Sequence, residues 1–471
     1  MAVPIAGEAV TVPSADPVEV TNPYDGEILG LVPRCGAEQV DRACRAAAAA
    51  LAREDFPQHE RAAVLERAAA LLRDRAERFA ETITLESGKP IRTARVEASR
   101  CADTFTYAAL EARRLTGEMV PMAGTASGAG KLGFALRVPI GVVAAISPFN
   151  FPLNLVAHKL APAVAAGCPV VLKPAPQTPL SGLRLVELLV EAGLPADWIS
   201  VVTDGGKEAG EPLVAHELPA MITFTGSAPV GWSIAAAAPR KKVALELGAS
   251  SPVVVEPDAD LERVASMVRV AGFSHAGQSC ISVQRVLVHR AVHEEMVDRL
   301  RKAAESLVLG DPRDEATDVG PLIRTAEVDR IRGWTDEALG RGAELVTGGT
   351  VTDDGILRPT VVDRAPPDTN LCAREVFGPV VVTIPYDDFD EALRLANDTE
   401  FGLHAGVFTH DLSKALLAAR KLDFGGVLIN EVPTFRADQQ PYGGVRESGN
   451  TREGPAYTVH EMTELRFVSF Q

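Results

Sequence analysis

Residues Gly141-Val142-Val143-Ala144-Ala145-Ile146 form a short apolar run with no charged side chain, and four similar runs follow before residue 248. Runs of this length between helical stretches are typical of strands buried on both faces. Regular alternation of such strands with helices predicts a parallel, doubly wound α/β sheet that binds ligands at the carboxyl ends of its strands. The predicted strands cover 141–146, 169–172, 199–202, 221–224 and 243–247, and the predicted helices cover 152–166, 180–193, 206–216 and 228–238.

A second series of the same kind begins after Gly248. Apolar runs again alternate with segments of helical periodicity, which predicts a second doubly wound α/β domain. The fold class is therefore α/β with two doubly wound domains. The predicted strands of the second series cover 252–256, 285–288, 361–362 and 379–384, and its predicted helices cover 260–276, 291–307, 325–341, 389–397 and 412–421.

The segments outside these two series predict smaller elements. Two short strands, 18–20 and 28–32, flank a turn, and helices are expected over 37–54, 58–85 and 91–115. Residues 117–139 resemble a long hairpin around a glycine-rich loop, and 463–470 alternate like a strand that could extend the same sheet. Because an exposed hairpin needs its edges covered, we expect it to pair with another subunit.

Composition narrows the class of protein. The 471 residues carry a formal net charge of −16, which disfavours nonspecific binding to nucleic acid or to an anionic membrane. The six cysteines form no CxxC pair, so neither a metal site nor a disulfide framework is expected, and reduced thiols in a cytoplasm fit better. We see no signal-peptide pattern and no apolar run long enough to span a membrane.

Cys280 lies among small residues in Ala276-Gly277-Gln278-Ser279-Cys280-Ile281-Ser282. Gly277 and Ser279 leave open approach to the thiol, and nearby backbone amides could turn toward an oxyanion. By itself the heptad is weak evidence for a nucleophile, because most lone cysteines are small buried residues with no chemical role.

Polar residues also follow several of the predicted strands. Asn150, in Ser147-Pro148-Phe149-Asn150-Phe151-Pro152, is either a turn former or an amide donor aimed at a reacting oxygen. Lys173 ends a buried strand, where a surface cap is the alternative to a ligand contact. Glu246 ends an apolar strand and could be a general base or part of a salt bridge.

Two further segments carry candidate ligand contacts. Gly226-Ser227 follows a strand and opens a helix whose N-terminus could hold a phosphate, although no GxGxxG is present and a plain tight turn would look the same. Glu375-Val376-Phe377-Gly378-Pro379 offers a carboxylate and an aromatic ring before a strand.

Together these segments resemble the aldehyde dehydrogenase superfamily over nearly the whole chain. They also occur in the order that the family uses, which makes a chance match negligible. The matching segments are Asn150, Lys173, Gly226-Ser227, Glu246-Leu247-Gly248, Gly277-Gln278-Ser279-Cys280, Glu375-Val376-Phe377-Gly378-Pro379 and Pro441-Tyr442-Gly443-Gly444.

The resemblance implies a covalent oxidation. Cys280 would attack the aldehyde carbon, while the Asn150 amide and the Cys280 backbone N–H hold the oxyanion. After hydride transfer to a nicotinamide, Glu246 would activate water to hydrolyse the thioester. A glutamate at position 246 favours this acid-forming branch over transfer of the acyl group to coenzyme A. A noncatalytic homologue that serves as a structural or binding protein is the alternative.

The resemblance also implies a Rossmann-like domain that binds NAD, with NADP possible. The glutamate often found three residues after the family lysine is Pro176 here, which leaves the choice of coenzyme open. Glu375 and Lys173 would position ribose groups, and Phe377 would pack near the nicotinamide. The cofactor-binding residues implied are Ser147, Phe149, Lys173, Gly226, Ser227, Leu247, Glu375 and Phe377.

The substrate implied is a small polar or anionic aldehyde, such as a semialdehyde, a lactaldehyde or a phosphonoaldehyde. Arg100 resembles an arginine of branches that act on short anionic aldehydes, but Ser279 stands where phosphate- or phosphonate-specific members often have arginine. The residues expected to line the substrate tunnel, with Arg100 added, are Arg100, Phe151, His158, Ser279, Ser282 and Arg436.

The strand and helix pattern and the family resemblance together predict the domain boundaries. Residues 1–117 and 140–248 are expected to form the cofactor-binding domain, and 249–447 the catalytic domain. Residues 118–139 and 457–471 are expected to form the element that assembles a homodimer or homotetramer in the cytoplasm.

Overall fold

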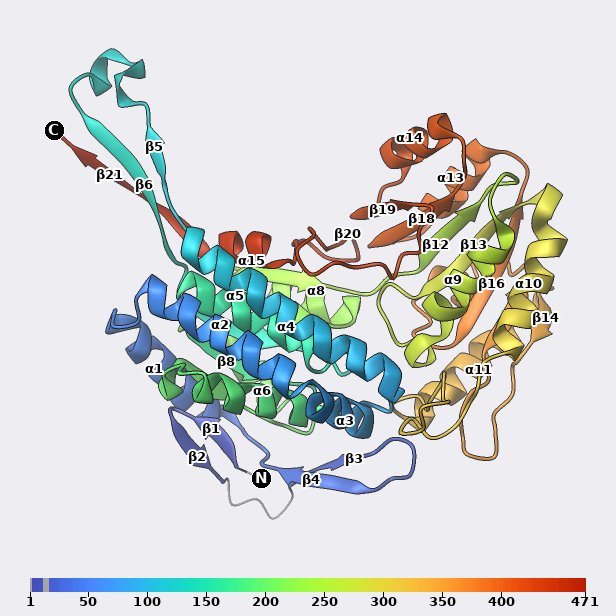
Figure 1. The fold of residues 1–471 in the computed structure, drawn as a ribbon, viewed down its shortest axis with the longest axis horizontal. Helices are drawn as coiled ribbons and strands as arrows, with labels where there is room; N and C mark the ends of the chain where they lie inside the picture. The colour runs from blue at the N-terminus through green and yellow to red at the C-terminus, as the bar shows by residue number, and fades with distance from the viewer. Residues whose placement is uncertain (1, 12–16) are drawn as a thin grey trace.

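The computed structural model describes residues 2–11 and 17–471. Two sheets dominate it, one parallel and the other parallel except for one antiparallel edge strand, and they lie in separate halves of the molecule (Figure 1). The first is five-stranded with the order β11-β10-β7-β8-β9, so the chain moves outward from central β7 in one direction and then crosses to the other side. Its strands are β7 (Val142–Ile146), β8 (Val170–Lys173), β9 (Ile199–Val201), β10 (Pro219–Thr225) and β11 (Lys242–Glu246).

Helices from the first half of the chain pack around this sheet. Every residue of α5 is buried, since α5 lies between the sheet and the neighbouring helices α2 and α4. Alanines and branched apolar residues fill these contacts. The helices are α1 (Ala37–Ala52), α2 (Gln58–Asp74), α3 (Ala76–Ser87), α4 (Ile91–Arg114), α5 (Asn154–Ala166), α6 (Pro179–Glu191), α7 (Gly210–Ala215) and α8 (Ala228–Ala237).

Two of these helices differ from the sequence prediction. The helix expected over 58–85 is two helices, because the backbone leaves the helical region at Arg75, with φ −109° and ψ 18°. The helix expected over 206–216 begins only at Gly210. There the carboxylate of Asp204 accepts hydrogen bonds from the N–H groups of Ala209 and Gly210 at 3.0 and 3.2 Å, which fixes the start of α7.

The second sheet has seven strands in the order β14-β15-β16-β13-β12-β18-β19 and confirms a second α/β unit. Strands β14, β18 and β19 were not predicted from the sequence. The strands are β12 (Ser251–Val255), β13 (Val283–His289), β14 (Glu344–Thr347), β15 (Thr360–Asp363), β16 (Val380–Tyr386), β18 (His404–Phe408) and β19 (Gly426–Ile429), and the helices are α9 (Leu261–Phe273), α10 (His293–Glu305), α11 (Thr325–Gly340), α12 (Asn370–Ala373), α13 (Phe389–Asn397) and α14 (Leu412–Lys421).

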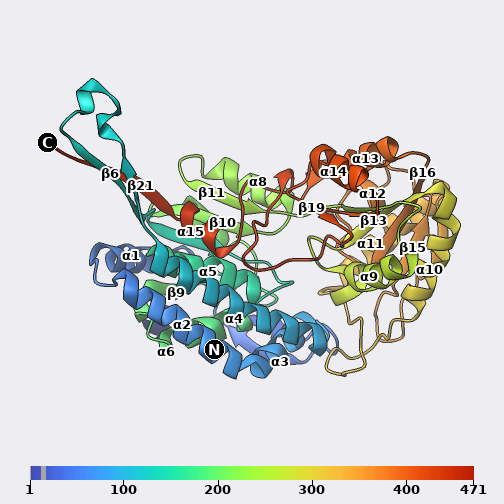
Figure 2. The same ribbon diagram turned by 45° about the horizontal axis from the view of Figure 1, so that its top comes forward.

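A three-stranded antiparallel sheet projects from the body of the molecule (Figures 1 and 2). Strand β21 (Thr463–Phe470) pairs with β6 (Leu132–Pro139) over its full length, and β5 (Glu118–Val120) lies on the other side of β6. The final strand therefore extends the hairpin sheet, as the sequence predicted. Several apolar side chains on it are exposed, namely Met119, Leu132, Leu136, Leu465, Phe467 and Phe470.

Before it reaches β21, the chain returns from the second sheet to the first. The N–H of Leu247 donates to the carbonyl of Ser448 at 3.1 Å, and α15 (Pro455–Glu461) packs on α5 and α4. This return places residues 442–453 beside the carboxyl end of β11. The small remaining strands are β1 (Val3–Ile5), β2 (Glu8–Val10), β3 (Val18–Thr21), β4 (Ile28–Val32), β17 (Phe401–Gly402) and β20 (Val445–Arg446).

Candidate active site

The loop that carries Cys280 joins α9 to β13 and has an unusual backbone. His275, Ala276 and Gly277 all have positive φ values, of 50°, 53° and 70°. A Cβ at Gly277 would lie 2.1 Å from the carbonyl oxygen of Gly378, so only glycine fits there. Strain of this kind in a residue other than glycine is uncommon and collects at functional sites.

Cys280 opens onto a cavity of about 500 Å³. Among the residues that the structure describes it is the only partly exposed cysteine, since Cys35, Cys44, Cys101, Cys168 and Cys372 lie buried as free thiols. Its Sγ lies 2.9 Å from the hydroxyl oxygen of Tyr442. Burial raises the pKa of the Cys280 thiol to about 12, and the contact with Tyr442 acts in the opposite direction.

Asn150 follows β7 and touches the cysteine loop directly. Its Nδ2 donates a hydrogen bond to the carbonyl oxygen of Gln278 at 2.9 Å, and the side chain is buried. A primary amide has a second N–H, which this contact leaves free for another acceptor. This hydrogen bond holds the Asn150 amide against Gln278, which precedes Cys280 by two residues in the chain.

Glu246 ends β11 in a closed environment. It is 3% exposed, and among the residues that the structure describes neither carboxylate oxygen has a hydrogen-bond partner. A Cβ at Gly443 would lie 2.7 Å from Oε1, so the return segment passes tightly against it. Burial raises the pKa of Glu246 well above its ordinary value, and the nearby carboxylate of Glu453 raises it further.

A buried group of charges lies next to Glu246. The Nζ of Lys159 donates to the hydroxyls of Thr223 and Thr225 at 3.1 and 2.7 Å and lies 3.5 Å from Glu453. Burial alone would raise the pKa of Glu453, but Lys159 and Arg436 outweigh it and lower that pKa to about 2. Glu453 is thus negatively charged, and its charge disfavours ionisation of the neighbouring Glu246.

Residues that the sequence assigned to the substrate mostly line the same cavity. Arg100, Phe151, Ser279 and Arg436 do so with Cys280. His158 is fully buried instead, and its Nε2 lies 2.9 Å from Oδ1 of Asp438.

Ser282 is turned away from this cavity. Its Oγ donates to the carbonyls of Ala271 and Gly272, so it secures the end of α9.

The cavity is lined by four arginines. Several of its lining residues were not predicted from the sequence. Arg92 and Arg269 join Arg100 and Arg436 in its wall, and Asp318 lies between the first two, 2.6 and 2.9 Å from their guanidinium nitrogens. His275 and Tyr442 also line it. Lys159 and Glu453 were missed as well, although a lysine inside the apolar run 153–166 is a visible signal of a buried partner.

The proposed coenzyme residues gather at the carboxyl edge of the five-stranded sheet. Ser147, Lys173 and Leu247 directly follow or end β7, β8 and β11, while Gly226-Ser227 joins β10 to α8. The side chain of Ser227 makes no capping hydrogen bond, so the first amides of α8 are free of a side-chain cap at the point where the strand order reverses. This edge fits a dinucleotide, whose phosphates bind at such helix N-termini.

The residues expected near the nicotinamide lie on two loops, because Phe149 follows β7 whereas Glu375 and Phe377 precede β16. The rings of Phe149 and Phe377 meet edge to face with centroids 5.7 Å apart. The carboxylate of Glu375 accepts a hydrogen bond from the N–H of Ala249 at 3.3 Å, and burial raises its pKa to about 7. Near the opposite end of the edge, the Nζ of Lys173 lies 2.9 Å from Oδ1 of Asp204.

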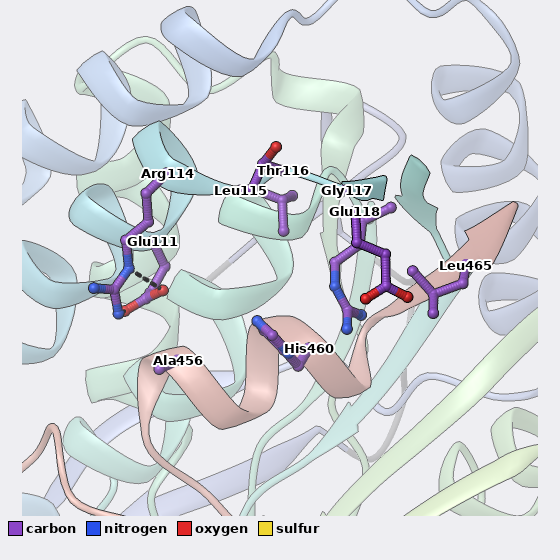
Figure 3. Close-up of a pocket in the computed structure, with 10 residues that line it drawn as sticks. Glu111, Arg114, Leu115, Thr116, Gly117, Glu118, Ala456, His460 and Leu465 are labelled. Carbon is purple, nitrogen blue, oxygen red and sulfur yellow. Dashed lines mark hydrogen bonds and ion pairs between the residues drawn. The ribbon is translucent and has the colours of Figure 1, made fainter. Parts of the chain in front are cut away.

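A separate pocket of about 370 Å³ lies at the base of the projecting sheet (Figure 3). Arg114, Arg137 and His460 line it, and none of the predicted site residues does. Within residues 2–11 and 17–471 there is no group of three or more His, Cys, Asp or Glu side chains that could hold a metal ion. No helix of that part of the chain is long and apolar enough to cross a membrane.

Known proteins share the sequence and the fold of this chain. The model of the aldehyde dehydrogenase family matches residues 11–468. A 3-sulfolactaldehyde dehydrogenase of Priestia megaterium is 44% identical over 455 residues, covering 97% of this chain and 95% of that protein. Aldehyde dehydrogenase 21 of Physcomitrella patens, in a crystal structure with its reaction product succinate, superimposes with a TM-score of 0.95 at 40% identity, covering 100% of this chain and 98% of that one.

A second solved structure supports the coenzyme class. The glyceraldehyde-3-phosphate dehydrogenase GapN of Methanocaldococcus jannaschii, complexed with NADP, gives a TM-score of 0.93 at 36% identity and covers 98% of this chain and 100% of that one. The chain belongs to the aldehyde dehydrogenase family and has its two-domain fold. It is an NAD(P)-dependent aldehyde dehydrogenase.

Proposed function

We propose that this enzyme oxidises a small aldehyde with an anionic head group to the carboxylic acid, through a thioester on Cys280. The observation that carries the proposal is the arginine-lined cavity onto which Cys280 opens. In a protein with a net charge of −16, an anionic substrate needs a local positive site of this kind. Relatives that act on small aldehydes, including 3-sulfolactaldehyde and one crystallised with succinate as product, support the same substrate class.

The residues of this chain would divide the reaction as follows. The Cys280 sulfur forms a bond to the aldehyde carbon, and the free N–H of the Asn150 amide and the Cys280 backbone N–H stabilise the oxyanion. The bound nicotinamide supplies the hydride acceptor. Glu246 then takes a proton from a water molecule, whose oxygen bonds to the thioester carbon while the carbon–sulfur bond breaks. The acid leaves, and the sulfur is free for another cycle.

The environment of Glu246 supports its role as base. A carboxylate with a raised pKa is a stronger base than an ordinary glutamate, and neither oxygen of Glu246 is engaged in a hydrogen bond among the residues that the structure describes. The carboxylate of Glu453 is unsuited to that task, because its ion pairs with Lys159 and Arg436 lower its pKa to about 2 and make it a weak base.

The test separates the two halves of the reaction. Cys280→Ala should abolish acid formation while coenzyme binding persists, whereas Glu246→Gln should give one burst of reduced coenzyme and then slow turnover. Cys101→Ala, at a fully buried cysteine on α4, is the matched control and should keep turnover. Turnover by Cys280→Ala within tenfold of wild type would overturn the proposal.

The organisation of the chain is part of the same proposal. Residues 1–117 and 140–248 would bind the coenzyme, 249–447 would carry the nucleophile, and 118–139 with 457–471 would assemble a homodimer or homotetramer. Exposed apolar side chains on the projecting sheet support the assembly. Free, mostly buried cysteines support a reducing cytoplasmic location.

A further inference from the structure

The hydroxyl of Tyr442 contacts the sulfur of the nucleophile. It is 2.9 Å from the Cys280 Sγ, within hydrogen-bond distance for a contact that involves sulfur. Tyr442 is 2% exposed, so little water competes for that contact. In the sequence Tyr442 stands out only as part of the segment Pro441-Tyr442-Gly443-Gly444.

The tyrosine ring is fixed on several sides. The guanidinium carbon of Arg436 lies 3.8 Å from the centre of its face, and the ring of His404 meets it at 5.0 Å with an interplanar angle of 72°. The backbone of Tyr442 exchanges two hydrogen bonds with Glu453, at 3.0 and 2.6 Å. The hydroxyl is therefore preorganised, and it does not need to be ordered when the thiol reacts.

The direction of the hydrogen bond follows from the charges nearby. Burial raises the pKa of Tyr442 well above its ordinary value, and the adjacent Cys280 raises it further, so the phenol cannot serve as the base that takes the thiol proton. Glu246 and Glu375 both disfavour a negative charge on the Cys280 sulfur, whereas Tyr442 and Arg436 favour one. Once the sulfur carries a negative charge it can only accept, so the phenolic O–H is then the donor.

We propose that Tyr442 is a catalytic residue that donates a hydrogen bond to the Cys280 thiolate and so makes the nucleophile available in a buried, carboxylate-rich site. The proton that leaves the thiol passes to water in the cavity onto which Cys280 opens, since the phenol keeps its own. When sulfur bonds to the aldehyde carbon its negative charge passes to the aldehyde oxygen, and when the thioester is hydrolysed the same hydrogen bond receives the departing thiolate. This inference rests on the proposed role of Cys280.

Alkylation of the thiol by iodoacetamide tests the proposal without aldehyde turnover. The rate at Cys280, followed by mass spectrometry of its peptide from pH 6 to 10, should fall about three- to tenfold in Tyr442→Phe, and its pH dependence should move up by about one unit. Tyr386→Phe is the matched control, because it removes a buried hydroxyl that bonds the carbonyl of Val255 at 2.9 Å in the other sheet. It should leave the rate unchanged.

A second measurement covers the case in which Tyr442→Phe folds poorly. Global replacement of tyrosine by 3-fluorotyrosine makes each phenol a stronger donor, so Cys280 should be alkylated faster in the labelled wild-type protein and not in labelled Tyr442→Phe. Unchanged alkylation in both experiments would overturn the proposal and leave Tyr442 a packing residue. That failure is distinct from failure of the proposed function, which would appear as turnover by Cys280→Ala.

Discussion

Arg100 and Asp438 form a two-point contact across 338 positions of the chain: Nε and Nη2 of Arg100 donate to the two carboxylate oxygens at 3.2 and 2.9 Å. The same carboxylate also accepts from the amide of Asn154 at 3.2 Å and meets His158. Arg100 therefore enters the cavity wall from a fixed position, with part of its charge already balanced.

Removal of Arg100 should weaken binding of an anionic aldehyde selectively. Arg100→Ala should raise KM for a short anionic aldehyde by about tenfold or more over its effect on an uncharged aldehyde of similar size, since a charge-assisted hydrogen bond contributes about 1.5–3 kcal/mol. Steady-state kinetics with both substrates measure this difference. Arg95→Ala is the matched control, because Arg95 lies on the same helix but pairs with Glu77 and Glu315 outside the cavity.

The alternative role for Arg100 is structural support. If Arg100 only ties α4 to Asp438, Arg100→Ala should lower kcat/KM equally for both aldehydes and reduce the melting temperature. That result would leave the substrate class open and would contradict the assignment of an anionic head group to this part of the cavity.

The pH dependence of turnover should show the titration of Glu246, the proposed general base. Because burial raises the pKa of Glu246, the residue stays protonated to a higher pH than an ordinary carboxylic acid, and a protonated base cannot accept a proton from water. Steady-state turnover should therefore fall as pH decreases, with a midpoint above 4.5, the ordinary value for glutamate. Glu246→Gln should remove this acidic limb, while Glu447→Gln, at an exposed position on the return segment, should keep it. A limb that survives in Glu246→Gln would assign the base elsewhere.

Coenzyme preference should depend on Asp204. Its buried carboxylate lies 2.9 Å from the Nζ of Lys173, the lysine proposed to hold a ribose, so it places negative charge where a 2′-phosphate would bind. We expect NAD to be preferred, with measurable use of NADP. Asp204→Asn keeps an oxygen for the N–H groups of Ala209 and Gly210 and should improve the NADP-to-NAD affinity ratio about tenfold, or 1.4 kcal/mol.

Fluorescence titration with each coenzyme measures these affinities without turnover. Asp197→Asn, at an acid paired with Arg53 on the surface, is the control. A wild-type preference for NADP above about a hundredfold, or 2.7 kcal/mol, would reveal a phosphate-binding group not recognised among these residues.

The fold was largely predictable because its strands are short, apolar and separated by clear helices. The break at Arg75 was not, because no glycine or proline marks it; its guanidinium instead meets Glu191 of α6, a tertiary contact that no local pattern contains. Strand β18 was missed because His404-Ala405-Gly406-Val407-Phe408 includes a glycine and a histidine. Glycine is needed there, since a Cβ at Gly406 would lie 2.6 Å from the carbonyl oxygen of Glu431.

The proposed site was predictable only where a motif carried it. Cys280, Asn150 and Glu246 stand in recognisable segments, and the structure places Asn150 against the cysteine loop. Their partners come from distant parts of the chain. Tyr442 and Glu453 reach the site because residues 442–453 return to β11, and no periodicity in the sequence reveals which strand they meet.

Assembly should depend on the projecting sheet. Phe467 is 54% exposed and Phe470 is 56% exposed on a strand that has β6 on one side and no further neighbour in its sheet among the described residues. Apolar side chains on such a sheet are normally covered by a partner, because leaving them in water costs about 25 cal/mol for each Å². Light scattering at micromolar concentration should give a mass two or four times the 49.9 kDa of one chain.

A charge placed on this surface should weaken the assembly. Phe467→Glu should shift the mass toward that of a single chain, because the carboxylate would have to lose its water in the interface. Leu412→Glu, at a 72% exposed leucine on α14 in the other half of the molecule, adds the same charge and should leave the mass unchanged (Figure 1). A wild-type mass near 49.9 kDa would contradict the assigned role of this sheet, and equal loss of mass in both variants would show that net charge controls the assembly instead.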